Sequence, residues 1–443
     1  MESSSDIQKQ VDHLIDTRPG KELLQHHYED PAREVAPGIF RSSGATAAYM
    51  IVHDEGRIIV NTGMGYEAVH HKRVFDAICS GPTTHILTTQ AHVDHVGGVA
   101  LFRDPETIYI AQQNNVACQA DDARIQSLRY RTAKVWFDIT GAAAQRIASQ
   151  NPGVPMRQDS PTPDVVFADR YNFKVGGRDV ELIAATGETI DSMIVWLPAS
   201  QTALISNLLG PLFPHFPNFN TLRGDRYRFV EPYLETVDKL RHLCPSTLVT
   251  GRHEPIIGSE LIDAAFARLH GAVDFVHRST LEGLNAGRDV FTLMKEITLP
   301  PALRVGQGYG KVSWGVRTIW ETYMGWFHLQ STTELYPDQS IEALSELVDI
   351  AGVEAVLDRA TQLLEVGEPV RAIFLAEAVL HKNSDHASAS GLLVRAHQAL
   401  LAAGGDESFW ESGWLHDQIQ KMRNTILEKH FFLDLLTYSP EVV

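Results

Sequence analysis

The sequence predicts an α/β layered domain followed by an all-α domain, and three observations support this. Short runs rich in β-branched and aliphatic residues, such as 47–52 and 57–63, end at Gly, Asp or Asn turns, as strands do. A helical stretch near 66–79 and an apolar strand at 85–87 complete the strand, helix, strand order of layered α/β proteins. Beyond about residue 270, apolar residues recur at three- and four-residue spacing, which is typical of amphipathic helices.

Length and charge limit the kinds of function. At 443 residues the chain exceeds what one hydrophobic core supports, so we expect a layered domain at 36–270 and a helical domain at 271–443. Residues 1–35 are polar and helix-tending, which indicates an N-terminal arm that packs on another element. A net charge of −17 argues against nonspecific binding to nucleic acid or anionic membranes. An anionic substrate must therefore meet a local basic pocket.

Cysteine usage and hydropathy indicate a reduced, cytoplasmic setting. Cys79, Cys118 and Cys244 lie far apart and follow no metal-ligand spacing, which favours ordinary thiols. The N-terminus lacks the basic start and apolar stretch of a signal peptide, and no window reaches transmembrane length. We expect no membrane partner.

Further apolar runs predict strands in the second half of the layered domain, at 180–184, 193–197, 203–207 and 247–250. The last of these ends at Gly251-Arg252-His253-Glu254-Pro255. His253 therefore lies at the carboxyl end of a strand, where α/β sheets hold their chemistry. The alternative for His253 is a loop histidine without a ligand.

The densest group of metal-competent side chains is Gln90-Ala91-His92-Val93-Asp94-His95, followed by Gly97-Gly98. Imidazole nitrogens and carboxylate oxygens at this spacing suit zinc or another divalent ion, and the glycines permit a tight turn. The alternative is a polar surface loop after a strand. We predict a metal site that includes His92, Asp94, His95 and His253.

Two other strand ends supply candidate ligands. Glu188 follows Thr186-Gly187, and its alternative is a helix-capping acid. Asn207 ends another strand, but a carboxamide carries no charge and binds divalent metals weakly. Gln90 shares that limitation.

An arginine-rich segment is the candidate anion site. Arg223, Arg226 and Arg228 lie in one eight-residue segment, 221–228, although the chain as a whole is acidic. Their forked guanidinium groups suit the binding of an oxyanion. Structural ion pairing is the equal alternative. We predict that Arg223 and Arg226 contact substrate. His215, in Phe213-Pro214-His215-Phe216-Pro217, is a candidate proton donor to a leaving group, with a loop histidine of no catalytic role as the alternative.

The metal motif resembles the His-x-His-x-Asp-His signature of the metallo-β-lactamase superfamily, with Gln90 in place of its first histidine. Two later segments, 307–317 and 323–327, resemble the Tyr-Gly-x-x-Ser-x-x-Val-Arg and Tyr-x-Gly-Trp-Phe signatures of the alkyl sulfatase family. The resemblance covers residues 36–430. It implies an αββα metallo-β-lactamase sandwich followed by an all-α dimerisation domain, and hence a homodimer.

The resemblance also implies roles for single residues. Glu188 and His253 match metal ligands, and Arg223 matches the sulfate-binding position. Tyr309, in the first dimerisation signature, is a further predicted substrate contact. His215 is the nearest histidine to the family's proton donor, although it is displaced from that position. The chain departs from the superfamily at three positions, where carboxamides stand: Gln90, Asn207 and, in the turn where Asp is usual, Asn61.

The favoured hypothesis is a metallohydrolase that cleaves a sulfate ester of a small organic alcohol. It uses one or two zinc or other divalent ions, with metal-bound hydroxide as the attacking group and Arg223 holding the anion. Asp94 and His215 are the predicted catalytic residues. The runner-up directs the activated water to a carbon electrophile, such as a lactone, ester or halide, at an altered or mononuclear centre. The third hypothesis is a metal-poor binding or scaffold dimer.

Overall fold

The computed structural model describes residues 4–18, 20–24 and 28–437, with side chains described as far as residue 427. It divides into two compact units, of which one ends at Tyr323 and the other begins at Met324. Within the described ranges, no helix combines the length and hydropathy that a membrane crossing requires.

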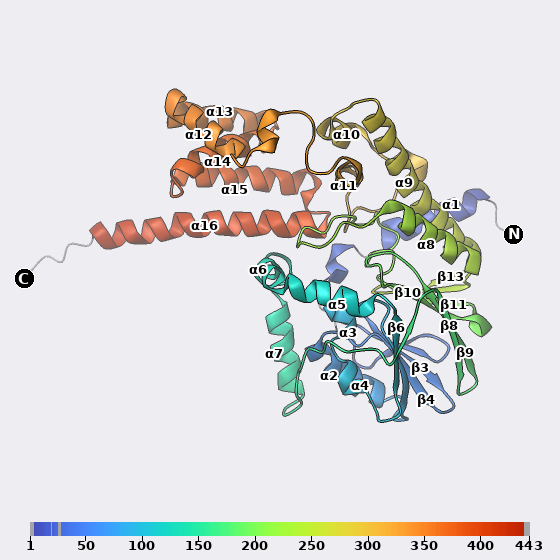
Figure 1. Ribbon diagram of the computed structural model, residues 1–443. Coiled ribbons are helices and arrows are strands. Elements are labelled where there is room, and N and C mark those ends of the chain that lie inside the picture. Colours follow the sequence, from blue (N-terminus) through green and yellow to red (C-terminus); the bar gives the residue numbers. More distant parts are fainter. Residues whose placement is uncertain (1–3, 19, 25–27, 438–443) are drawn as a thin grey trace, which may run out of the picture. The chain divides into compact units, whose positions relative to one another are not determined.

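Two β-sheets stack face to face in the first unit (Figure 1). The first sheet has the order β1-β2-β3-β4-β5-β6-β7, and the second has the order β13-β12-β11-β10-β9-β8. Strands of the first sheet are β1 (Arg33–Ala36), β2 (Ile39–Ser42), β3 (Ala48–His53), β4 (Gly56–Val60), β5 (Thr83–Leu87), β6 (Ile108–Gln112) and β7 (Val165–Phe167). Those of the second are β8 (Arg170–Val175), β9 (Arg178–Ala184), β10 (Met193–Leu197), β11 (Thr202–Ser206), β12 (Thr247–Thr250) and β13 (Ile256–Ile257).

Alternating side chains on each strand supply two apolar layers. On β3, Tyr49 and Ile51 join the core between the two sheets, whereas Ala48 and Met50 join the core beneath the outer helices. The second sheet contributes inward-facing residues such as Leu182 and Val195 to the shared core. Because β3 is buried on both faces, the sequence shows it as a continuous apolar run.

Helices cover the outer face of each sheet. On the first sheet, α2 (Gly65–Asp76) buries Val74 and Phe75, and the short α4 (Val99–Phe102) buries Phe102 against them. On the second sheet, α9 (Ser259–Asn285) contacts β12 and β13, and α8 (Val230–Leu243) packs along α9. The arrangement is helix, sheet, sheet, helix. The predicted αββα sandwich is therefore confirmed.

The N-terminal segment packs on α9. Helix α1 (Ser4–Thr17) buries Val11 and Ile15, and the Arg268 Nη1 atom on α9 lies 3.0 Å from Asp12 Oδ1. A single helical turn, η1 (Lys21–Leu24), follows. Strand β1 begins at Arg33, so the end of the predicted arm belongs to the first sheet.

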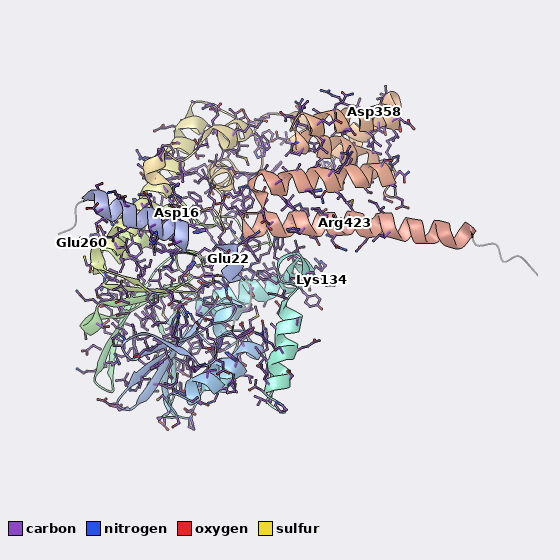
Figure 2. All side chains as sticks on the ribbon, turned by 180° about the vertical axis from the view of Figure 1, so that it is seen from behind. Asp16, Glu22, Lys134, Glu260, Asp358 and Arg423 are labelled. Carbon is purple, nitrogen blue, oxygen red and sulfur yellow. The ribbon has the colours of Figure 1, made fainter. Side chains whose placement is uncertain are left out.

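Three helices that the sequence did not predict lie between β6 and β7: α5 (Asn115–Arg124), α6 (Gln126–Trp136) and α7 (Thr140–Gln150). Helix α6 contains no fully buried residue, and Lys134 projects from it away from the sheets (Figure 2). Its weak apolar periodicity explains why no helix was predicted at these residues.

The second unit is helical. It contains α12 (Ser340–Ala351), α13 (Val353–Glu365), α14 (Pro369–Lys382), α15 (Ala387–Leu400) and α16 (Phe409–Thr437), with single turns η4 (Thr332–Leu335) and η5 (Leu401–Gly405). Successive helices from α13 to α16 pack on one another, and buried alanines such as Ala372 and Ala376 let them approach closely. The paired helices predicted for 351–404 are confirmed.

The division between the units falls later in the chain than residue 270. That residue lies inside the continuous helix α9, which belongs to the first unit together with α10 (Val290–Glu296) and η3 (Pro301–Leu303). The first unit ends within the last turn of α11 (Val312–Met324). Helical periodicity begins well before the division, so a boundary placed by periodicity alone comes too early.

Candidate metal and anion site

The loop after β5 carries the metal-like motif and is anchored to the end of β4. The Thr62 amide donates to the His95 carbonyl at 2.8 Å, and the Gly98 amide donates to Thr62 Oγ1 at 3.0 Å. Asn61 adopts a left-handed conformation with φ 60°, which asparagine tolerates better than most residues. This turn holds the short helix α3 (Val93–Val96) against the end of the sheet.

Two other strand ends complete the site. The Glu188 amide donates to the Leu208 carbonyl at 3.2 Å, and the preceding position must be glycine because a Cβ on Gly187 would lie 1.9 Å from that carbonyl oxygen. The Gly251 amide donates to the Ser206 carbonyl at 2.9 Å, which fixes the segment that leads to the buried His253. Glu188, Asn207 and His253 are therefore held by backbone packing.

One half of the centre consists of Gln90, His92 and Glu188. Gln90 Nε2 lies 2.8 Å from His92 Nδ1 and 3.1 Å from Glu188 Oε2. An amide nitrogen only donates, so Gln90 Nε2 donates to both neighbours. On the other side of the ring, His92 Nε2 lies 3.5 Å from Asp225 Oδ2. His92 Nδ1 and Glu188 Oε2, the atoms whose lone pairs would bind a cation, are therefore already hydrogen-bonded to the neutral NH₂ group of Gln90.

The other half of the centre surrounds the Asp94 carboxylate, which accepts the last hydrogen bond of two hydrogen-bonded chains of side chains. Thr46 Oγ1 donates to Asp94 Oδ2 and accepts from Asn207 Nδ2 at 3.0 Å. His95 Nδ1 donates to Asp94 Oδ1 at 3.2 Å. Asn207 therefore turns its amide nitrogen toward Asp94, where a ligand would present an oxygen.

The second of these chains begins at Asn61. Its Nδ2 atom donates to Ser206 Oγ at 3.1 Å, and Ser206 Oγ lies 3.4 Å from His95 Nε2. Burial raises the pKa of the Asp94 carboxyl, but the charges and hydrogen bonds of His95, His92 and Thr46 hold it well below its usual range. Asp94 is thus a half-buried anion.

The two halves differ as metal positions. Within the described ranges, no three His, Cys, Asp or Glu side chains are grouped closely enough to hold a metal ion. The Gln90 half does not fit a metal, because its acceptors are hydrogen-bonded to the Gln90 amide and its carboxylate, Glu188, is also paired with Arg228. The donor types of Asp94, His95 and His253 do suit a divalent cation, and Asp94 supplies the negative charge.

Arginines gather beside the Gln90 half. The Nη2 atoms of Arg223 and Arg228 each lie 3.9 Å from Asp225 Oδ2, and Arg228 Nη1 lies 3.5 Å from Glu188 Oε1. The pocket also contains Arg129 of α6, whose Nη2 lies 3.2 Å from Asp225 Oδ2. Burial, and then the charge of Arg223, lowers the pKa of Arg129 to about 10.

Arg129 was not predicted as a site residue, and Arg228 was not assigned to the pocket. Arg129 is far from the other arginines in the chain and lies on a helix that was not predicted. Arg226, which was predicted to contact substrate, instead is largely exposed and points to Asp121, with Nη2 2.9 Å from Oδ2. Neighbouring arginines of one loop point in different directions, and spacing alone does not separate them.

Tyr309 lies close enough to this cluster to feel its charges. Burial, and then the negative charge of Glu188, raises the pKa of the Tyr309 hydroxyl, while Arg228 and Arg223 lower it. The predicted contact of Tyr309 with substrate stays a prediction.

His215 lies in a different environment. Its Nδ1 accepts from the Gly308 amide at 2.9 Å, and burial lowers its pKa to about 4. The charges that act on it come from Arg18 and Glu22, not from the metal-like centre. A neutral, tightly packed histidine is a poor proton donor at neutral pH, so the geometry gives no support to the catalytic role predicted for His215.

A cavity of about 240 Å³ lies beside His253. Polar residues including Glu29, Arg41 and Arg252 line it. Arg41 donates through Nη1 to the His253 carbonyl at 2.9 Å and pairs with Glu29, with Nη2 2.8 Å from Oε1. This ion pair fixes the backbone of His253.

The architecture is the αββα sandwich that the sequence resemblance implied. Residues 292–416 match the family profile described as alkyl sulfatase dimerisation. The structure resembles that of the stereoselective inverting sec-alkylsulfatase Pisa1 from Pseudomonas sp., with a TM-score of 0.74 and 17% identity, over 92% of this chain and 69% of that one. A double mutant of that enzyme gives a TM-score of 0.75 at 18% identity, over 88% of this chain and 65% of the other.

Curated sequences give the same result. The chain is 25% identical over 326 residues to a linear primary-alkylsulfatase of Pseudomonas sp. (strain ATCC 19151), which covers 68% of this chain and 60% of the relative. It is 22% identical over 275 residues to an alkyl/aryl-sulfatase of Saccharomyces cerevisiae, covering 57% and 42%. The chain thus matches less than two thirds of the length of either relative. Residues 292–416 thus match the alkyl sulfatase dimerisation profile, and the chain shares its fold with the sec-alkylsulfatase Pisa1.

Proposed function

We propose that the chain is a hydrolase of sulfate monoesters of organic alcohols. The observation that carries this proposal is the arginine pocket. Arg129, Arg223 and Arg228 converge beside His92 and Glu188 in a chain of net charge −17, and guanidinium forks suit sulfate oxygens. Relatives named as alkylsulfatases support the same substrate class.

Asp94, His95 and His253 would hold one divalent ion, for which zinc is our proposal. When bound, such an ion would supply Lewis acidity to a substrate oxygen or a water molecule. The chain's own groups have separate tasks. Arg223 and Arg228 bind the sulfate group, and Tyr309 limits the pocket beside Glu188. The chain from Asn207 through Thr46 fixes the orientation of the Asp94 carboxylate.

A second candidate is a metal-free anion-binding protein. It is favoured by the three carboxamides Gln90, Asn207 and Asn61, each of which donates a hydrogen bond into the centre. This candidate predicts anion binding without turnover. We also propose that the chain forms a homodimer, supported by the dimerisation profile, and that it is cytoplasmic.

The test is release of inorganic sulfate from a panel of short-chain primary and secondary alkyl sulfates, with and without a chelator. We expect turnover that the chelator abolishes. Arg223→Gln should remove it, whereas Arg226→Gln, which changes an exposed arginine of the same loop, should not. Binding without sulfate release would support the second candidate, and product from a lactone, ester or halide alone would support a carbon electrophile.

A further inference from the structure

The anion pocket already contains a carboxylate. Asp225 Oδ2 lies within 4 Å of four nitrogen atoms, at 3.5 Å from His92 Nε2, 3.2 Å from Arg129 Nη2 and 3.9 Å from the Nη2 atoms of Arg223 and Arg228. Its other oxygen accepts from the Arg226 amide at 2.9 Å. One oxygen atom of the chain thus occupies the point where the guanidinium groups meet.

The charges of this cluster balance only because Asp225 is present. Arg129 pairs with Asp122 as well as with Asp225, and Arg228 pairs with Glu188 at 3.5 Å. Arg223 has Asp225 as its ion-pair partner at 3.9 Å. Three guanidinium groups therefore face three carboxylates. Removal of Asp225 leaves one positive charge in excess.

The guanidinium groups around Asp225 favour the charged form of its carboxyl group. A sulfate monoester carries a single negative charge, as Asp225 does, and can replace it charge for charge. A phosphate monoester carries about −1.5 to −2 at neutral pH and would bring an excess of negative charge.

We propose that Asp225 occupies the subsite for the substrate's anionic group, so that the pocket accepts a monoanion only by exchange with this carboxylate. The inference deepens the proposed function, because it specifies the class of anion. Asp225 is a specificity-determining residue: it lowers the affinity for every anion and disfavours dianions most. The carboxylate leaves the three arginines when the substrate binds, and its Oδ1 contact with the Arg226 amide keeps it at the edge of the same loop.

The test is calorimetric titration of methyl sulfate and methyl phosphate into chelator-treated protein at pH 8 and fixed ionic strength. We expect Asp225→Asn to bind methyl sulfate about tenfold more tightly than the unchanged chain, which corresponds to one lost competing contact. The gain for methyl phosphate should be larger. Combination with Arg223→Gln should remove both gains.

Asp121→Asn is the matched control. Asp121 lies near the pocket but contacts the exposed Arg226 and Arg124, so its removal changes the net charge equally without freeing the three arginines. Equal or weaker methyl sulfate binding by Asp225→Asn would overturn the inference, and so would an equal gain in Asp121→Asn. Asp225→Ser serves as a second variant, and melting curves verify that each variant is folded.

The titration separates the inference from the proposed function because chelated protein does not turn over. If the unchanged chain releases sulfate and Asp225→Asn shows no gain in binding, the inference fails and the function stands. If Asp225→Asn gains affinity and no variant releases sulfate, the function fails and the inference stands.

Discussion

The two halves of the centre satisfy their buried acceptors in different ways. Around Gln90, a neutral amide donates to His92 and Glu188, and Arg228 supplies the positive charge. Around Asp94, hydrogen bonds from Thr46 and His95 orient a carboxylate but leave its negative charge in place. The carboxylate of the Gln90 half is paired with an arginine, whereas the carboxylate of the Asp94 half is held by Thr46 and His95. A half-site therefore loses its affinity for a cation when a guanidinium group already pairs with its carboxylate.

Replacement of Asp94 should have the largest effect. Asp94→Asn removes the negative charge of the half that retains ligand-type residues, so we expect sulfate release to fall by about 100-fold or more. The measurement is kcat/KM for a primary alkyl sulfate. Asp164→Asn, which breaks an exposed ion pair with Arg103 far along the chain, is the matched control and should leave kcat/KM unchanged. Similar losses in both variants would remove the distinction between the halves.

The fold was largely predictable, because strands such as β3 and β10 are buried on both faces and appear as continuous apolar runs. The spacing of His92, Asp94 and His95 also predicted that they share one loop, but their role as metal ligands stays a prediction. The directions of the hydrogen bonds could not be predicted from the sequence. In the structure, Gln90 and Asn207 turn their amide nitrogens toward the centre and act as donors. The position of Arg129 in the pocket could not be predicted from the sequence, because it depends on how α6 packs. Leu128 on that helix lies against Gly224, where a Cβ would be 3.0 Å from Leu128 Cδ2.

The pKa of Glu67 depends on the charge of Asp94, so the pH dependence of stability tests the Asp94 half. Burial, with a further contribution from the charge of Asp94, raises the pKa of Glu67 to about 7. The unfolded chain releases this proton near pH 4.3, so the folded state binds one more proton between these values. The stabilisation is full below about pH 4.3 and is lost as pH rises through 7, a change of about 4 kcal/mol in the free energy of unfolding.

Glu67→Gln should abolish that dependence. Urea unfolding of the unchanged chain and of Glu67→Gln from pH 5 to 8 measures it, with Glu106→Gln, an exposed acid, as the control. Asp94→Asn should flatten the slope in part, because it removes a neighbouring negative charge. A slope that survives in Glu67→Gln would assign the proton to another group.

His215→Asn should have the smallest effect on turnover. An asparagine oxygen can accept from the Gly308 amide as His215 Nδ1 does, so we expect a stability loss of about 1 kcal/mol and less than about a threefold change in kcat. The pH profile of kcat should keep its shape. Loss of the alkaline limb of the kcat pH profile in this variant would support His215 as a proton donor. The active site would then include a residue outside both halves of the centre.

The central claim is that only the Asp94 half retains the capacity for a cation. Metal content per chain, measured by plasma mass spectrometry after reconstitution with excess zinc and gel filtration, tests it most directly. We predict one ion on the unchanged chain, none on His253→Ala, and a second ion on Gln90→His, which restores a ligand in place of the amide donor. Two ions on the unchanged chain, or none, would contradict the claim.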